Sequence, residues 1–304
     1  MKWGQAVVIA VLAAVAAVAA CSGPAPAGGP GGSVLRVVAA ENSWGSIAAQ
    51  LGGSRAQVQS VVTDPNADPH EYPSNTNDSR AIALADVVIV NGAGYDTWAQ
   101  AMIGASTRSG RKVLNVADVL GRKQGDNPHF WYSPTYVAQV ADRITATYRS
   151  ADPAGATYFD GRRAALDTAL QTFRDRVAEI EQRFGGVKVG ATESIFAYMA
   201  TALGLDVISP PGFMTAVAEG TEPPVGAVVE FERQIQQREV KVLVYNVQTI
   251  SATTTNIRRM AEAGDIPVVG ISETLQPERA TFQDWQLRQL LALEHALNAS
   301  AQAG

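Results

Sequence analysis

The stretch AGATYFDGRRAALDTALQTFRDRVAEIEQRF, residues 154–184, separates two series of short apolar runs in this chain. Its apolar positions recur at intervals of four and three residues, and they are Leu166, Leu170, Phe173, Val177 and Ile180. This spacing places the apolar side chains on one face of an α-helix. The stretch is therefore predicted to form one long amphipathic helix between two folded parts.

Short runs rich in β-branched residues lie on both sides of this helix. They cover residues 35–39, 58–63, 87–91 and 113–116 before it, and residues 187–191, 207–209, 240–245 and 268–271 after it. Helical patterns lie between the runs, at residues 76–85, 95–106, 134–150, 195–203, 225–239 and 253–263. This alternation is typical of parallel sheets.

The pattern predicts an α/β fold with two lobes, each a mostly parallel four-stranded sheet flanked by helices. The lobes are expected at residues 34–150 and 186–304, joined by one long rigid helix at residues 151–185. Roughly 270 residues follow the N-terminal segment, which is enough for two lobes.

The N-terminal segment has the features of an export signal. A basic start is followed by an apolar run at residues 6–17 and then by Val18-Ala19-Ala20-Cys21. The run is shorter than the roughly 20 residues of a membrane-spanning helix. Small residues before a cysteine resemble a bacterial lipobox, which implies lipid attachment at Cys21. Residues 1–20 are therefore expected to form a signal peptide, and residues 21–33, rich in Pro, Gly and Ala, a flexible tether.

Composition limits the classes of function. The 304 residues carry a net charge of −5, with 46% hydrophobic and 17% charged residues. Such a chain is expected to fold compactly. The sequence has no basic patch, so nucleic acid is not an expected partner. Cys21 is the only cysteine, and its lipidation would leave none for a disulfide.

Two of the three histidines lie in X-Pro turns. The segments are DPHEY at residues 68–72 and NPHFW at residues 127–131, which contain His70 and His129. A histidine held on such a turn beside an aromatic residue and an acid or amide has a defined orientation. Two such turns in a chain with so few histidines suggest paired ligands for one transition-metal ion.

Two glutamates complete a candidate ligand set. Glu193 follows the predicted strand at residues 187–191, and Glu273 follows the one at residues 268–271. His70 and His129 also lie beyond the carboxyl ends of predicted strands. Ligands of open α/β sheets bind at that edge, so we predict a metal site in the cleft between the lobes. Two neutral imidazoles and two carboxylates balance the charge of one divalent ion such as Zn²⁺, Fe²⁺ or Mn²⁺.

The two histidine segments resemble the motifs of the zinc/manganese ABC-transporter solute-binding lipoproteins, a family also named for adhesins. Four further segments resemble that family in the same order, namely NGAGYDTW at residues 91–98, TESIFAY at 192–198, EP at 222–223 and residues 266–274. The resemblance covers nearly all of residues 34–304. It implies two lobes bridged by one rigid helix.

The resemblance also implies a function and partners. A member would capture one divalent metal ion outside the cytoplasm, anchored to the membrane through lipidated Cys21, and deliver it to a permease driven by a cytoplasmic ATPase. Carried over residue by residue, the metal ligands are His70, His129, Glu193 and Glu273. We expect a monomer that is not an enzyme.

Three departures from the family pattern bear on the metal. Zinc-type members usually carry histidine where this chain has Glu193, whereas manganese-type members carry glutamate. The fourth ligand is commonly aspartate, and here it is Glu273. The loop at residues 121–126 lacks the histidine-rich insertion of many zinc-type members. These departures favour Mn²⁺ or Fe²⁺, but Zn²⁺ binds nitrogen and oxygen sites more tightly than Mn²⁺. The sequence leaves both open.

Two further residues are candidates to orient the histidine rings, namely Asp68 and Asn127. Two alternative functions also remain. One is a metal-dependent surface adhesin, as the family name suggests. The other is a secreted metallohydrolase, although catalytic zinc sites usually keep three protein ligands and an open position for water. The sequence contains no HExxH or GxSxG motif.

Overall fold

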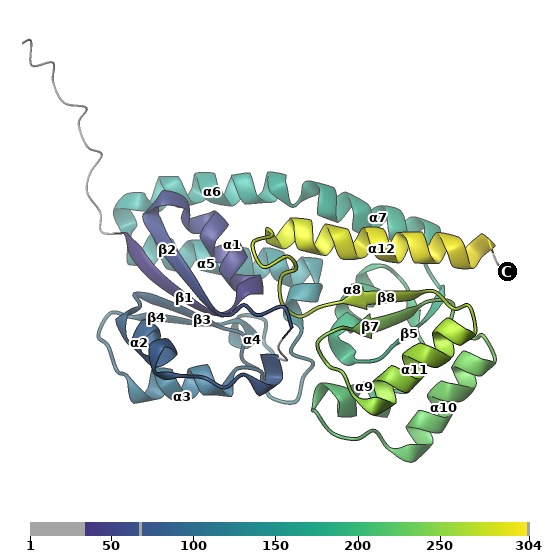
Figure 1. Cartoon of the computed structure of the whole chain (residues 1–304). Helices are drawn as coiled ribbons and strands as arrows, with labels where there is room; N and C mark the ends of the chain where they lie inside the picture. The colour runs from purple at the N-terminus through teal and green to yellow at the C-terminus, as the bar shows by residue number, and fades with distance from the viewer. Residues whose placement is uncertain (1–33, 67–68, 303–304) are drawn as a thin grey trace, which may run out of the picture. The chain divides into compact units, whose positions relative to one another are not determined.

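The computed structural model describes residues 34–66 and 69–302, without the side chain of Glu71. The predicted signal peptide, Cys21, the tether and Asp68 lie outside these described residues. Within the described part the predicted α/β architecture is confirmed, with two lobes that each contain a four-stranded sheet flanked by helices (Figure 1).

The first lobe contains a sheet with strand order β2-β1-β3-β4, in which every pair is parallel. Its strands are β1 (Leu35–Glu41), β2 (Ala56–Val62), β3 (Val87–Val90) and β4 (Lys112–Asn115). Its helices are α1 (Asn42–Gly52), α2 (Thr76–Leu84), α3 (Thr97–Ala105), α4 (Val116–Val119) and α5 (Pro134–Ala151). The central strand β3 is buried along its whole length, as expected for a parallel strand covered on both faces.

The second lobe repeats this arrangement with strand order β6-β5-β7-β8, again all parallel. Its strands are β5 (Lys188–Ala191), β6 (Asp206–Val207), β7 (Leu243–Asn246) and β8 (Val268–Ile271). Its helices are α8 (Ala197–Ala202), α9 (Pro211–Ala218), α10 (Val225–Gln236), α11 (Ala252–Ala263) and α12 (Phe282–Gln302). Strand β7 lies between β5 and β8, so three neighbouring strands end side by side.

The helix predicted between the lobes is observed as two consecutive helices. They are α6 (Ala156–Ala169) and α7 (Gln171–Phe184), with Leu170 between them. The break is slight, because Leu170 keeps right-handed helical dihedral angles. Its N–H donates to the carbonyl of Leu166 at 2.9 Å, and its own carbonyl accepts from the N–H of Arg174 at 3.0 Å. The pair runs along both lobes in Figure 1.

The C-terminal helix α12 packs along α7 and links it to the second lobe (Figure 1). Glu294 of α12 accepts a hydrogen bond from Arg176 at 2.8 Å and another from Arg183. One continuous core of buried apolar residues contains Leu35 of β1, Phe173 of α7 and Leu297 of α12. The two lobes therefore share a core across the linking helices.

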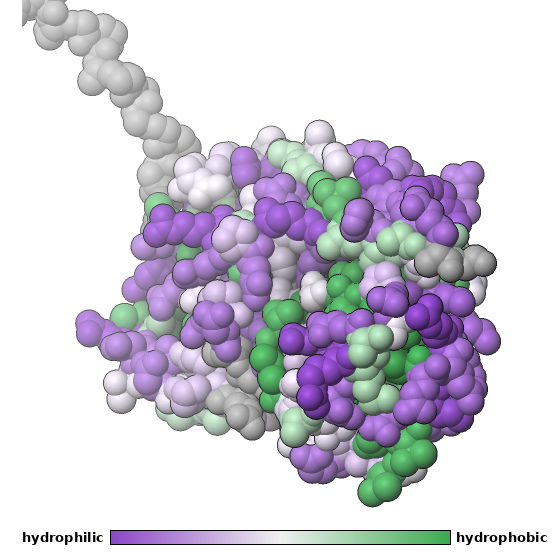
Figure 2. Space-filling view, turned by 45° about the vertical axis from the view of Figure 1, so that its right-hand side comes forward, coloured by the Kyte–Doolittle hydropathy of each residue, from purple (hydrophilic) through white to green (hydrophobic). Residues whose placement is uncertain are grey.

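The surface of the described part is mostly polar. Figure 2 shows hydrophilic residues over most of one face, interrupted by smaller apolar patches. The most exposed large apolar side chains are those of Val225, Ile250 and Val229. Among the described residues, no helix combines the length and the apolar character needed to cross a membrane.

Replacement of Phe173 by alanine tests whether the contact between α7 and α12 holds the lobes together. Phe173 is 2% exposed, and its ring centroid lies 6.3 Å from that of Phe282. Deletion of a buried phenylalanine ring leaves a cavity, so we expect a loss of about 3–5 kcal/mol in the free energy of unfolding. Urea denaturation measures it. The control Leu291→Ala removes a side chain that is 44% exposed on α12, the helix that carries Phe282, and it should cost under about 1 kcal/mol. Equal losses in both variants would contradict this account.

Candidate metal centre

The structure brings His70, His129, Glu193 and Glu273 together at the carboxyl edges of the two sheets. One ligand atom from each of the four lies within 4.8 Å of the others. His70 lies on the 3-10 turn η2 (Pro69–Glu71) after β2, and His129 directly precedes the turn η3 (Phe130–Tyr132). Glu193 follows β5, and Glu273 follows β8. Parallel strands all point the same way, so residues after them share one edge.

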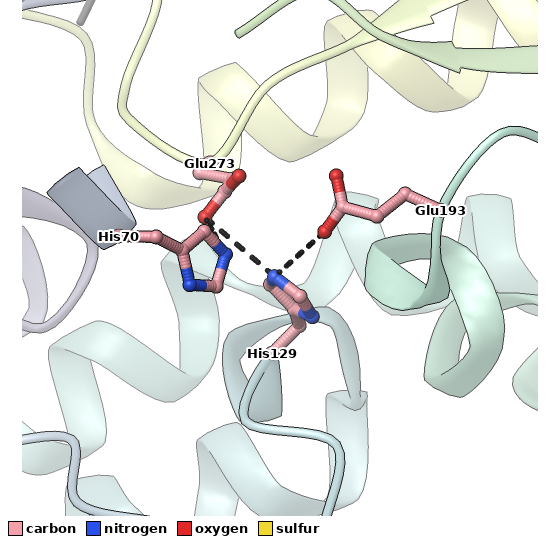
Figure 3. A group of neighbouring side chains, drawn as sticks. All are labelled: His70, His129, Glu193 and Glu273. Atoms are coloured by element: carbon pink, nitrogen blue, oxygen red, sulfur yellow. Dashed lines mark ion pairs between the residues drawn. The ribbon is translucent and has the colours of Figure 1, made fainter. Parts of the chain in front are cut away.

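The nitrogen and oxygen atoms of these side chains face one another (Figure 3). His129 Nε2 lies 3.3 Å from Glu193 Oε1 and 3.6 Å from Glu273 Oε2. His70 Nε2 lies 3.3 Å from Glu273 Oε2. His129, Glu193 and Glu273 are at most 1% exposed, whereas His70 is partly exposed. Three of the four side chains are therefore buried, and His70 is the one that solvent reaches.

Asn127 fixes the orientation of the His129 ring. The side-chain amide of Asn127 donates to the carbonyl of Ser194 at 2.7 Å, which directs its oxygen toward His129. That oxygen lies 2.7 Å from His129 Nδ1 and accepts the Nδ1 proton. The lone pair of His129 Nε2 then points into the site. This contact suits the role that the sequence suggested for Asn127.

Two atoms that face into the site have no hydrogen-bond partner among the described residues. They are His129 Nε2 and Glu193 Oε1, both fully buried. Buried polar atoms are almost always hydrogen-bonded, because an unsatisfied one costs free energy. Two buried polar atoms that face each other without a hydrogen bond suit a shared cation. The residues present therefore fit a bound divalent metal ion.

Tyr95 is part of the site and was not recognised as such from the sequence. Its hydroxyl donates to Glu273 Oε2 at 2.5 Å, and its ring packs edge-on against His70 with centroids 4.7 Å apart. Burial and then the charge of Glu273 raise its pKa well above the usual value, so the hydroxyl keeps its proton at neutral pH.

A glycine turn places Tyr95 in this position. Gly92 has a φ of 77°, and a Cβ there would lie 2.1 Å from the Asn115 side-chain oxygen. The tyrosine N–H donates to the carbonyl of Gly92 at 3.0 Å. The segment at residues 91–98 resembled the family, which is the signal that could have indicated Tyr95.

Asn246 is the second residue that sequence reasoning missed. It ends β7, between the strands that precede the two glutamates, and it is 1% exposed. Its side-chain nitrogen donates to Glu193 Oε2 and, at 2.9 Å, to Glu273 Oε1. The carboxyl-edge rule that singled out the glutamates would also have selected Asn246, had the middle strand been considered.

The pKa values of the two buried carboxyl groups shift in opposite directions. Desolvation and then the charge of Glu273 raise the pKa of Glu193. Desolvation alone would also raise the pKa of Glu273, but the imidazoles of His70 and His129 outweigh it and hold this pKa well below its usual value. Glu273 is therefore charged near neutral pH, and the charging of Glu193 is opposed by its surroundings.

A cleft with a volume of about 510 Å³ opens beside the site. Its walls include His70, Tyr95 and Asn127 from the first lobe, and Ser194 and Glu219 from the second. The cleft is far larger than a single water, so it gives a hydrated ion a route to His70.

Residues 37–296 match the protein family described as ZnuA, zinc-uptake complex component A, periplasmic. The manganese-binding lipoprotein MntA of Halalkalibacterium halodurans is 25% identical over 242 residues, which are 77% of this chain and 79% of that protein. The metal ABC transporter substrate-binding lipoprotein ScbA of Streptococcus cristatus is 23% identical over 241 residues, 73% of this chain and 76% of that protein.

A solved structure has the same fold. The solute-binding protein FpvC from Pseudomonas aeruginosa, in complex with Mn²⁺, has a TM-score of 0.73 and 20% sequence identity. The alignment covers 88% of this chain and 99% of that chain. At this identity the likeness shows the fold alone.

Glu193→Gln tests whether the buried carboxylate of Glu193 destabilises the metal-free protein. The pKa of Glu193 is raised in the folded state, so its contribution to stability falls as pH rises from about 4.5 through that folded pKa. Each unit of such a shift costs about 1.4 kcal/mol above the folded pKa. Without metal, the variant should therefore be more stable than the wild type at pH 7. The difference should shrink below about pH 4.5.

Thermal denaturation of the metal-free proteins at the two pH values measures this difference. Glu181→Gln, on an exposed position of α7, serves as the control and should change stability at neither pH. A Glu193→Gln protein that is less stable than the wild type at pH 7 would show that the buried carboxylate does not destabilise the folded protein.

Proposed function

Because the chain belongs to the family of zinc-uptake complex component A proteins, we propose that it captures one divalent transition-metal ion outside the cytoplasm and delivers it to an ABC permease for import. The observation that carries the proposal is the convergence of two imidazoles and two carboxylates from opposite lobes. The names of the relatives, which include a manganese-binding lipoprotein and a metal ABC transporter substrate-binding lipoprotein, support it.

The proposed ligands are His70 Nε2, His129 Nε2, Glu193 Oε1 and Glu273 Oε2. Neutral imidazoles and ionised carboxylates supply four donor atoms and a charge of −2, which a divalent ion neutralises. The ion would also relieve the repulsion between Glu193 and Glu273, which helps to raise the pKa of Glu193. Mn²⁺, Zn²⁺ and Fe²⁺ all accept such mixed nitrogen and oxygen donors.

Capture and release follow from the enclosure of the site. The ion would enter through the cleft past His70, the one partly exposed ligand, and lose its water as the buried donors replace it. Ligands on both lobes make the bound state sensitive to lobe position, so docking on a permease that parts the lobes would release the ion. The shared core across α6, α7 and α12 limits how far the lobes can move.

We further propose that the chain is attached to the outer face of the cytoplasmic membrane. Residues 1–20 would be removed as a signal peptide, and Cys21 would carry the lipid. Residues 21–33 would then tether the two lobes, residues 34–150 and 186–304, close to the permease and its cytoplasmic ATPase. The lipoprotein relatives support this proposal.

We favour metal import over the two alternative functions suggested by the sequence, a surface adhesin and a metallohydrolase. The matched family is one of uptake components rather than enzymes. The donor set also favours binding over catalysis, because four protein ligands leave no position of a tetrahedral zinc site to a reactive water.

Thermal unfolding with added metal tests the proposal. Zn²⁺ or Mn²⁺ at about 100 times its dissociation constant should stabilise the protein by about 2.7 kcal/mol, because only the folded state binds it. His129→Ala should abolish this stabilisation, since it removes a buried ligand. His295→Ala, on the exposed side of α12, should retain it fully. Unchanged melting temperatures of the wild type with both ions at neutral pH would refute the proposed metal site.

A further inference from the structure

We infer that Asn246 sets the metal preference of this site in favour of zinc, by binding the second oxygen of both glutamates and holding each as a one-oxygen ligand. This inference rests on the proposed function, since it concerns the identity of the imported ion. It assigns Asn246 a positioning role, because its amide acts through Glu193 and Glu273 and does not contact the ion.

One amide group contacts both carboxylates. The side-chain nitrogen of Asn246 donates to Glu193 Oε2, and to Glu273 Oε1 at 2.9 Å. The remaining oxygens, Glu193 Oε1 and Glu273 Oε2, are the ones within 3.6 Å of His129 Nε2. Figure 3 shows the same division, with one oxygen of each glutamate turned toward the histidines and the other turned away. Each carboxylate therefore presents a single oxygen to the site.

The amide of Asn246 is itself held in this orientation. Its side-chain oxygen accepts the backbone N–H of Gln248 at 3.0 Å, so its nitrogen faces the carboxylates. Its backbone N–H donates to the Thr192 hydroxyl at 3.2 Å. Its side-chain nitrogen also lies 2.9 Å from the Thr249 hydroxyl, which is 3.4 Å from Glu273 Oε1. The asparagine cannot turn aside without losing several of these contacts together.

The number of oxygens presented decides which ion fits. Two imidazole nitrogens and two single oxygens give four donors, which is the tetrahedral number that zinc adopts. Mn²⁺ favours a larger oxygen shell, which two-oxygen carboxylates would supply. Four ligands at about 2.0–2.1 Å from a zinc ion lie about 3.3–3.4 Å from one another. Three of the six separations, at 3.3, 3.3 and 3.6 Å, are close to that edge length, and all four ligand atoms lie within 4.8 Å of one another.

This conclusion differs from the one suggested by residue types alone. Glutamate at position 193 favours manganese if each carboxylate is counted as a two-oxygen donor. The hydrogen bonds of Asn246 occupy one oxygen of Glu193 and one of Glu273. Each glutamate then offers the ion a single donor atom, as a histidine does. The preference is then set by a residue that donates nothing to the ion.

Asn246→Ala tests the inference, with Gln234→Ala as a matched control. Gln234 is also a buried amide, 7% exposed, but it donates to the carbonyl of Ile208 away from the site. Competition titration gives the ratio of Zn²⁺ to Mn²⁺ affinity for the full chain. X-ray absorption spectroscopy of the zinc-loaded proteins gives the coordination number. Asn246→Ser repeats both measurements if the alanine variant does not fold, because serine is too short to reach both carboxylates.

The wild type and Gln234→Ala should coordinate zinc with four nitrogen and oxygen atoms. Asn246→Ala should coordinate it with five or more, and its affinity ratio should fall at least tenfold, the lower end of what loss of an orienting partner costs a metal site. A smaller change in the ratio, or an unchanged coordination number of four, would overturn the role of Asn246 while leaving metal capture intact. A wild type that binds neither ion would instead reject the proposed function itself.

Discussion

The structure depends on one electrostatic constraint, which is that Glu193 and Glu273 are buried close together in a region almost closed to water. A buried carboxylate is costly unless it is paired or hydrogen-bonded. Among the described residues, the ion pairs of these glutamates are with histidine alone. Asn246, Tyr95 and Thr249 supply the other side-chain hydrogen bonds. These contacts offset only part of the cost of burying the two carboxylates, and a bound divalent cation would offset the rest.

The fold brings the two carboxylates together and also leaves a cleft through which a cation can reach them. Each lobe is a parallel sheet, so the residues after its strands gather at one edge, and the two edges face a common cleft. The helices α6, α7 and α12 share a core with both lobes and hold that geometry. Tyr132 adds a direct link, since its hydroxyl donates to the carbonyl of Ser272, the residue before Glu273. The position of the fourth ligand is thereby tied to the lobe that carries the histidines.

Much of this arrangement could be predicted from periodicity and strand position. The eight strand runs and the long amphipathic stretch predicted the two lobes and their connection, and the carboxyl-edge rule selected four side chains that the structure brings together. The break at Leu170 was not predictable, because the apolar spacing continues across it. Tyr95 lies in the family-like segment at residues 91–98, and Asn246 lies at the carboxyl edge of β7, so both positions carried a signal. Their hydrogen bonds to Glu273, which lies 178 residues from Tyr95 and 27 from Asn246, could not be read from the sequence.

The most direct test is a crystal structure of the protein grown with equal concentrations of Zn²⁺ and Mn²⁺, with anomalous diffraction measured at both absorption edges. The account predicts one anomalous peak that rises sharply across the zinc edge, about 2.0–2.2 Å from His70 Nε2, His129 Nε2, Glu193 Oε1 and Glu273 Oε2. The second oxygens of both glutamates should remain hydrogen-bonded to Asn246. The absence of any anomalous peak between these four side chains, or a peak that does not rise across the zinc edge, would contradict the account.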